Sequence, residues 1–212
     1  MPKCNRDTGF TKVELLVVVG VIIIFAVLAG AFVSSKKRTY SRTNCIANLK
    51  EIGVAENMFQ NDHNGNSPWS LSSVKGGTFQ YHTSGEQTFR HFQVQSNYII
   101  ATRLLICPQD NRQTAANWEN LVNSNLSYFV GLDSAPNLPM SIIAGDRNIT
   151  ADSSVILQAT SSAPPSWISS VGLHGNKGHL VFGDGHVEEL DSTGLANAIQ
   201  RTGIFTNHFA VP

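Results

Sequence analysis

The stretch that decides the fold is "TGFTKVELLVVVGVIIIF", residues 8–25. It opens an apolar run from Leu15 to Val33, 19 residues without a charged or hydrogen-bonding side chain. Glu14 stands directly before this run. A helix over residues 10–33 would be about 36 Å long, enough to cross a hydrocarbon core of about 30 Å. The sequence therefore predicts a membrane-length apolar helix with an acid at its start.

This apolar run has three interpretations. A buried core helix is disfavoured, because a chain of 212 residues rarely surrounds a helix on every face. A cleaved secretory signal fits the basic start at Lys3 and Arg6 and the small residues at 29–31, with cleavage at Ala31. A retained membrane helix is the third interpretation, and the residues before the run favour it.

Those residues carry a specific resemblance. The hexapeptide GFTKVE, residues 9–14, followed by an apolar helix, resembles the processing site of type IV prepilins and type II secretion pseudopilins. The resemblance implies that residues 1–9 are a leader, that the prepilin peptidase cuts between Gly9 and Phe10, and that Phe10 is then N-methylated. It also implies that Glu14 pairs with the N-terminal amine of a neighbouring subunit during assembly. Such a pairing has a physical reason, since a charge at membrane depth costs about 3 kcal/mol unless it is paired or shallow.

The basic residues that flank the run bear on its orientation. Counted alone, they favour a cytoplasmic C-terminal domain, because Lys36, Lys37, Arg38 and Arg42 follow the run whereas Lys3, Arg6 and Lys12 precede it. The processing motif is more specific than this count. We therefore expect a single-pass protein of the inner membrane whose C-terminal domain is extracytoplasmic.

The rest of the chain predicts an α+β fold. Apolar residues at helical spacing continue the helix in amphipathic form over residues 34–62, with a stripe at Tyr40, Cys45, Leu49, Ile52, Ala55 and Phe59. Residues 63–212 are expected to form a β-rich globular domain, so that a long helix packs on a small antiparallel sheet, the pilin-like arrangement. Strands are expected at 76–83, 89–94, 126–132 and 153–159, a hairpin at 178–190, and short helices at 97–105 and 192–200.

A second resemblance lies near the C-terminus. His174 is followed by nine residues and then Asp184-Gly185, a spacing similar to that of the prepilin-associated histidine–x9–Asp-Gly domain. Segments such as "IIAGDRNIT", residues 142–150, resemble pseudopilin-like families of Planctomycetes and Verrucomicrobia. The resemblance assigns no molecular role to the motif.

The same motif is the best candidate for site chemistry. His174, Asp184 and His186, with Asp146 upstream, offer ligands for a divalent ion. Calcium, which some major pseudopilins bind, needs six or more oxygen ligands, and this pattern lacks them. The favoured interpretation is a tight turn at Asp184-Gly185, with His174 bonded to nearby backbone, no metal and no cofactor. No nucleophile signature accompanies the histidine, so we expect no catalytic residue and no enzyme activity.

The cysteines leave two alternatives open. Cys4 falls in the leader, so Cys45 and Cys107 remain in the mature chain. Outside the cytoplasm they can form a disulfide, and otherwise they are two buried thiols that pack as small apolar residues.

The sequence as a whole predicts a structural subunit of a type II secretion pseudopilus or type IV pilus-like filament. Expected partners are the prepilin peptidase, copies of itself or other pseudopilins, the assembly platform and the membrane. Nucleic acid is not expected, because the net charge is zero and phosphate binding needs a basic surplus. The alternatives are a membrane-anchored extracytoplasmic binding module that forms no filament, and a secreted hydrolase behind a signal peptide.

Overall fold

The computed structural model describes residues 11–135, 137–150, 155–169 and 173–212, and the side chains of residues 28–40 lie outside this description. The chain divides into two compact units, Met1–Tyr40 and Ser41–Pro212. The predicted leader, residues 1–9, and the predicted cleavage and methylation residues, Gly9 and Phe10, lie outside the described residues.

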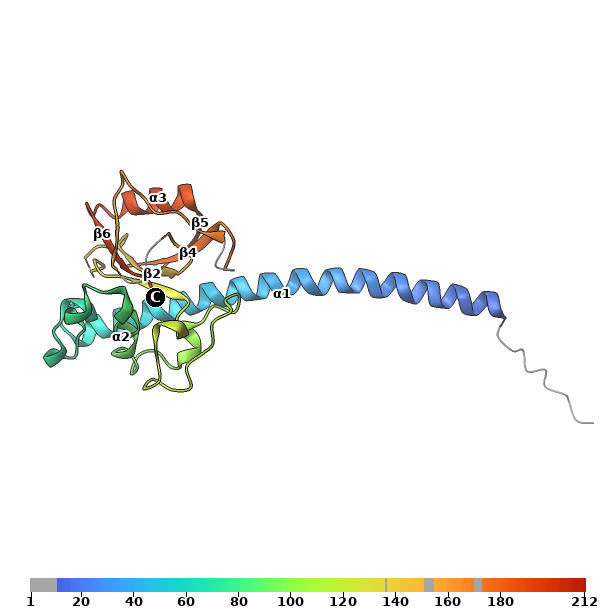
Figure 1. Cartoon of the computed structure of the whole chain (residues 1–212), viewed down its shortest axis with the longest axis horizontal. Coiled ribbons are helices and arrows are strands. Elements are labelled where there is room, and N and C mark those ends of the chain that lie inside the picture. Colours follow the sequence, from blue (N-terminus) through green and yellow to red (C-terminus); the bar gives the residue numbers. More distant parts are fainter. Residues whose placement is uncertain (1–10, 136, 151–154, 170–172) are drawn as a thin grey trace, which may run out of the picture. The chain divides into compact units, whose positions relative to one another are not determined.

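Helix α1 (Lys12–Asp62) is the longest element, with 51 residues (Figure 1). The predicted long helix is confirmed over its described part. Its first turn is closed by a capping box, because the Thr11 hydroxyl accepts from the Glu14 N–H at 3.3 Å and the Thr11 N–H donates to Glu14 Oε2 at 2.9 Å. The Thr11 hydroxyl also donates to the same carboxylate oxygen at 2.8 Å. Glu14 therefore has a hydrogen-bonding partner within its own chain, Thr11.

Apolar side chains cover every side of the first unit's helix where side chains are described. From Val13 to Val27 they are largely exposed, with exposed fractions such as 70% for Val13 and 69% for Val27. Within the described part of the chain, no helix reaches the combined length and hydropathy needed to cross a membrane.

The second unit contains a six-stranded antiparallel sheet in the order β3-β6-β1-β2-β4-β5. The predicted α+β class is confirmed. The strands are β1 (Tyr128–Gly131), β2 (Ile142–Asp146), β3 (Leu157–Ala159), β4 (Lys177–Phe182), β5 (Val187–Asp191) and β6 (Asn207–Ala210).

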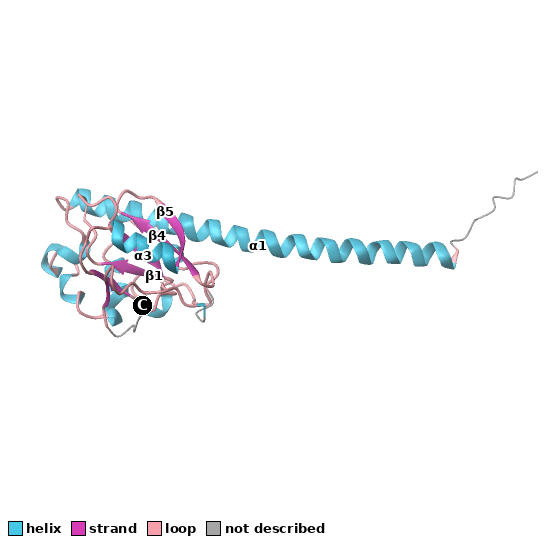
Figure 2. Ribbon diagram, turned by 90° about the horizontal axis from the view of Figure 1, so that it is seen from above, coloured by secondary structure: helices cyan, strands magenta, loops and turns pink. Residues whose placement is uncertain are grey.

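Two apolar clusters cover the two faces of this sheet. The buried stripe of α1, including Leu49 and Ile52, packs with Tyr128 and Val130 of β1. Phe129, the residue between them, belongs to the second cluster, as alternation along a strand requires. That cluster includes helix α3 (Ser192–Arg201), drawn in Figure 2 with β1, β4 and β5.

Helix α1 packs closely on the sheet at Gly53. A Cβ atom at this position would lie 2.8 Å from Cγ2 of Val181, so a side chain there would require Val181 or the helix to shift. The predicted stripe is confirmed at Cys45, Leu49, Ile52, Ala55 and Phe59, since each is at most 1% exposed, whereas the side chain of Tyr40 lies outside the described residues.

Two predicted strands are wrong. Residues 76–83 contain only a 3₁₀ turn, η3 (Phe79–Tyr81), and residues 89–94 fall in helix α2 (Thr88–Gln93), which lies against β1. The buried residues of α2 are Thr88, His91 and Phe92, spaced three and four apart as on one face of a helix. The apolar pattern of residues 89–94 therefore follows the helical period of about 3.6 residues and not the strand period of two.

Other elements match the prediction in part. The hairpin of β4 and β5, the strand at β1 and the helix α3 are confirmed. The helix expected at 97–105 is limited to a 3₁₀ turn, η5 (Thr102–Leu105). Strand β3 holds the end of the segment expected at 153–159, while residues 151–154 lie outside the described residues. Strands β2 and β6 were not predicted.

The buried face of α1 contains one carboxyl group, Glu56, which is 0% exposed. Gln60 Nε2 donates to Glu56 Oε1 at 2.8 Å and to Ser67 Oγ at 3.0 Å, whereas Glu56 Oε2 is buried without a hydrogen-bond partner among the described residues. Burial raises the pKa of Glu56 from 4.5 to about 7, because the anion loses its hydration.

This raised pKa predicts a pH-dependent loss of stability that Glu56→Gln removes. Below pH 4.5 the residue is neutral in both states, and between pH 4.5 and pH 7 only the unfolded chain releases the proton. The free energy of unfolding of the wild type should therefore fall by about 3 kcal/mol relative to Glu56→Gln as the pH rises through this range. Urea unfolding of both proteins at several pH values measures the difference. Glu51→Gln, at an exposed position of the same helix, is the control. A wild-type-to-variant difference that stays constant with pH would refute the prediction.

Candidate functional site: a buried histidine and aspartate cluster beside a disulfide

The centre of the candidate site is a contact between β2 and β4. Asp146 is the last residue of β2, and β4 pairs with β2 in antiparallel register, with Gly145 opposite Leu180. This register places His179 beside Asp146. The His179 backbone N–H donates to Asp146 Oδ2 at 2.7 Å, and His179 Nδ1 lies 2.8 Å from the same oxygen. Both side chains are fully buried.

A second histidine reaches the same carboxylate from the segment before β4. His174 Nε2 lies 3.5 Å from Asp146 Oδ2, and the His174 side chain is also fully buried. Its ring meets the ring of His179 edge to face, with the centroids 4.4 Å apart. One carboxylate oxygen therefore faces a nitrogen atom from each of two histidines.

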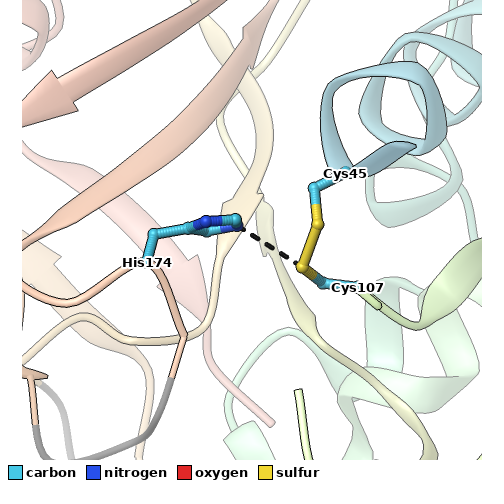
Figure 3. A group of neighbouring side chains, drawn as sticks. All are labelled: Cys45, Cys107 and His174. Atoms are coloured by element: carbon cyan, nitrogen blue, oxygen red, sulfur yellow. Dashed lines mark hydrogen bonds between the residues drawn. A yellow bond between two sulfur atoms is a disulfide. The ribbon is translucent and has the colours of Figure 1, made fainter. Parts of the chain in front are cut away.

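The cluster adjoins a disulfide between Cys45 of α1 and Cys107, which follows η5. The structure thus contains the first of the two alternatives that the sequence left open for these cysteines. Figure 3 shows the ring of His174 directed at the disulfide, with His174 Nε2 3.4 Å from Cys107 Sγ. Both cysteines are 0% exposed.

Burial dominates the electrostatics of this region. It lowers the pKa of His174, although the nearby Asp146 carboxylate acts in the opposite direction. It also raises the pKa of Tyr128 well above its usual value, with Asp146 adding to the effect. His174 is therefore held in the neutral form, which can ligate a metal or accept a hydrogen bond.

Several buried polar atoms of the cluster have no hydrogen-bond partner among the described residues. They are Asp146 Oδ1, His174 Nδ1 and His179 Nε2. Glu189 Oε2 lies 3.4 Å from His179 Nε2, within ion-pair distance but without hydrogen-bond geometry. Glu189 in turn lies 3.4 Å from Lys177 Nζ and 3.6 Å from Arg42 Nη1.

The predicted motif residues do not form one site. Asp184 and Gly185 lie in the turn between β4 and β5, where Gly185 adopts a left-handed φ of 85° and the His186 N–H donates to Asp184 Oδ1 at 3.0 Å. The tight-turn interpretation is right. The backbone partner expected for His174 is wrong, because this side chain contacts Asp146, His179 and the disulfide instead.

His186 also lies apart from His174. Its ring stacks on Phe182 at 4.4 Å, and its nitrogen atoms contact Asp184 and Glu188. His179 was not among the site residues predicted from the sequence. The available signal was a histidine inside the apolar strand "GHLVF", residues 178–182, where only a partnered polar side chain is tolerated.

The candidate site combines full burial with convergent nitrogen and oxygen donors. Such a site suits a bound ion or a shared proton rather than a large substrate, since its side chains are fully buried. Comparisons with protein-family models, with curated proteins and with solved structures found no match to this chain.

Proposed function

We propose that this chain is a structural subunit of a type II secretion pseudopilus or type IV pilus-like filament, with a pilin-like architecture. In this proposal the prepilin peptidase removes residues 1–9 and the subunit assembles through its N-terminal helix. The observation that carries the proposal is the apolar helix of the first unit, exposed on all sides from Val13 to Val27. The proposed role is structural rather than catalytic.

An apolar helix of this kind needs a covering surface. Leu16 is 71% exposed, Ile22 60% and Phe25 68%, and these residues lie on different sides of the helix. Burying apolar surface contributes roughly 25 cal/mol per Å². Extended exposed apolar surface marks an interaction site. A filament core, in which the same helix from neighbouring copies packs around it, supplies that cover, and the inner membrane supplies it before assembly.

The start of the helix supports the same proposal. Glu14 is held by Thr11 in the capping box, which leaves the carboxylate oriented and accessible at the helix terminus. Cleavage after Gly9 would create an ammonium group at Phe10. A carboxylate and an ammonium at the same depth in adjacent subunits would pair in an apolar core, where a lone charge is costly.

The second unit supports an extracytoplasmic location. Disulfides persist in oxidising compartments and are rare where thiols are kept reduced. The Cys45–Cys107 bridge therefore favours a domain on the outer side of the inner membrane. Sister pseudopilins and the inner-membrane assembly platform are the partners that such a subunit requires.

The proposal is tested by co-expressing the full chain with a prepilin peptidase and an assembly platform. Sheared material is then sedimented and viewed by electron microscopy. We expect the chain in pelletable fibres. Recovery of the mature chain only as dispersed membrane protein, in cells where another pilin does form fibres, would contradict the proposal.

A membrane-anchored binding module is the second candidate. A pocket of about 240 Å³ is lined by residues that include Trp69, Ser70, Asp133 and Ser134. A small polar ligand bound there would lie beside the carboxylate of Asp133 and the side chains of Trp69 and Ser70. This candidate predicts that ligand capture continues when fibre formation is blocked.

A further inference from the structure

We propose that Asp146, His174 and His179 bind one divalent transition-metal ion of the zinc class. The ion would join β2, β4 and the segment before β4 inside the second unit. This site is separate from the apolar helix on which the proposed filament function rests, and it differs from the metal set that the sequence suggested at Asp184 and His186.

The donor atoms have suitable spacing. Asp146 Oδ2 lies 2.8 Å from His179 Nδ1 and 3.5 Å from His174 Nε2. One donor atom from each residue lies within 4.8 Å of the others. Zinc–nitrogen bonds of about 2.0–2.1 Å in tetrahedral geometry place ligand atoms about 3.3–3.5 Å apart. Small side-chain adjustments therefore bring the three donors to bonding distance of one ion.

The donor types select the class of ion. Imidazole nitrogen and carboxylate oxygen suit zinc and its first-row neighbours. Calcium needs six to eight oxygen ligands and magnesium usually keeps several waters, whereas this set has one carboxylate. Three protein ligands leave one coordination position of a tetrahedral ion for water.

The buried carboxylate of Asp146 supports a cation in this cluster. Asp146 Oδ1 is buried without a hydrogen-bond partner among the described residues. The unpartnered ring nitrogens, His174 Nδ1 and His179 Nε2, are the ones that would not bind the ion. A buried carboxylate is costly unless it is paired or coordinates a metal. A divalent ion at this point would neutralise Asp146 and take His174 Nε2 and His179 Nδ1 as further ligands.

An outer carboxylate supports the assignment. Ligating histidines commonly face a carboxylate with the ring nitrogen that does not bind the metal. Glu189 Oε2 stands in this position, 3.4 Å from His179 Nε2, when His179 Nδ1 is the ligand. Glu189 is therefore assigned as a positioning residue. The neighbouring Glu188 pairs with Arg201 and contacts His186 instead, which makes it a matched control.

The first experiment measures metal content directly. The oxidised full chain is purified in mild detergent without reductant, stripped with a chelator, and dialysed against Zn²⁺ or Mg²⁺. We expect one Zn²⁺ per chain by mass spectrometry of the metal, and a higher unfolding temperature with Zn²⁺ than with Mg²⁺. Folded, oxidised chain that retains no stoichiometric zinc would overturn the proposal.

The second experiment locates the ion. Glu189→Gln should weaken zinc binding about 10- to 100-fold, the usual effect of losing an outer partner, while Glu188→Gln leaves it unchanged. His179→Gln should abolish binding, and His186→Gln should not. The Glu189 substitution is at a partly exposed side chain, so it tests the site even if His179→Gln fails to fold. Unchanged affinity in Glu189→Gln, or zinc loss in His186→Gln, would refute the assigned position.

Discussion

Replacing Glu14 by Gln is expected to abolish pelletable fibres while leaving the second unit folded. The substitution removes the negative charge but keeps an acceptor oxygen for the Thr11 capping contacts. Each subunit contact would lose a charge-assisted hydrogen bond, about 1.5–3 kcal/mol, which corresponds to a roughly 10- to 100-fold weaker association at every step. Because a fibre needs many successive contacts, that loss per contact prevents growth. Immunoblots of the sheared, sedimented fraction measure the effect.

The Thr11→Val variant distinguishes a role of Glu14 in fibre assembly from a role in the helix cap alone. It removes the hydroxyl that bonds both the backbone and the side chain of Glu14, but it keeps the acid. If Glu14 served only the helix cap, Thr11→Val would reduce fibres and Glu14→Gln would spare them. We expect the opposite result, in which Glu14→Gln abolishes fibres and Thr11→Val spares them. Equal fibre yields from Glu14→Gln and wild type would show that the charge has no part in assembly.

Removing the disulfide should cause a large loss of stability in the second unit. Replacing both Cys45 and Cys107 by Ala is expected to lower the free energy of unfolding by about 4 kcal/mol, because a bridge with a sequence separation of 62 restricts a long loop in the unfolded chain. The bridge joins α1 to the segment after η5, so its loss also frees the helix from the loop that packs on it. Urea unfolding in the presence of a chelator measures the change without any contribution from a bound metal.

The wild type under strong reductant is the matched control for the double variant. Both proteins lack the covalent link, and they differ only in two buried sulfur atoms. We expect their free energies of unfolding to agree within about 1–2 kcal/mol, the size of an ordinary buried substitution. A double variant as stable as the oxidised wild type would contradict the proposed contribution of the bridge.

A signal repeated over several turns made helix α1 predictable, and a sharp local signal made the β4–β5 hairpin predictable. The stripe from Cys45 to Phe59 repeats over several turns of α1, and repetition distinguishes a helix from a strand. The β4–β5 hairpin has a sharp local signal, because Gly185 supplies the positive φ that its turn requires. Short segments lacked such support. "FRHFQV", residues 89–94, fits both periods, and β6 has only four residues.

The candidate site depended on information that the sequence does not display locally. Asp146 and His179 are far apart in the chain and meet only because β2 pairs with β4, and β2 was not predicted as a strand. The motif spacing drew attention to His174 and Asp184, which the fold separates. The cysteine pair was easier to anticipate, since only two cysteines remain after the predicted leader, although its oxidation state could not be derived from spacing.

Mass spectrometry of the mature N-terminus tests the proposed function most directly. The chain is purified from cells that contain a prepilin peptidase, and its N-terminal peptide is sequenced. We expect a chain that begins with N-methylated Phe10, after loss of residues 1–9. A mature protein that retains Met1, or one that begins after Ala31, would contradict the assignment to a pilin-like filament.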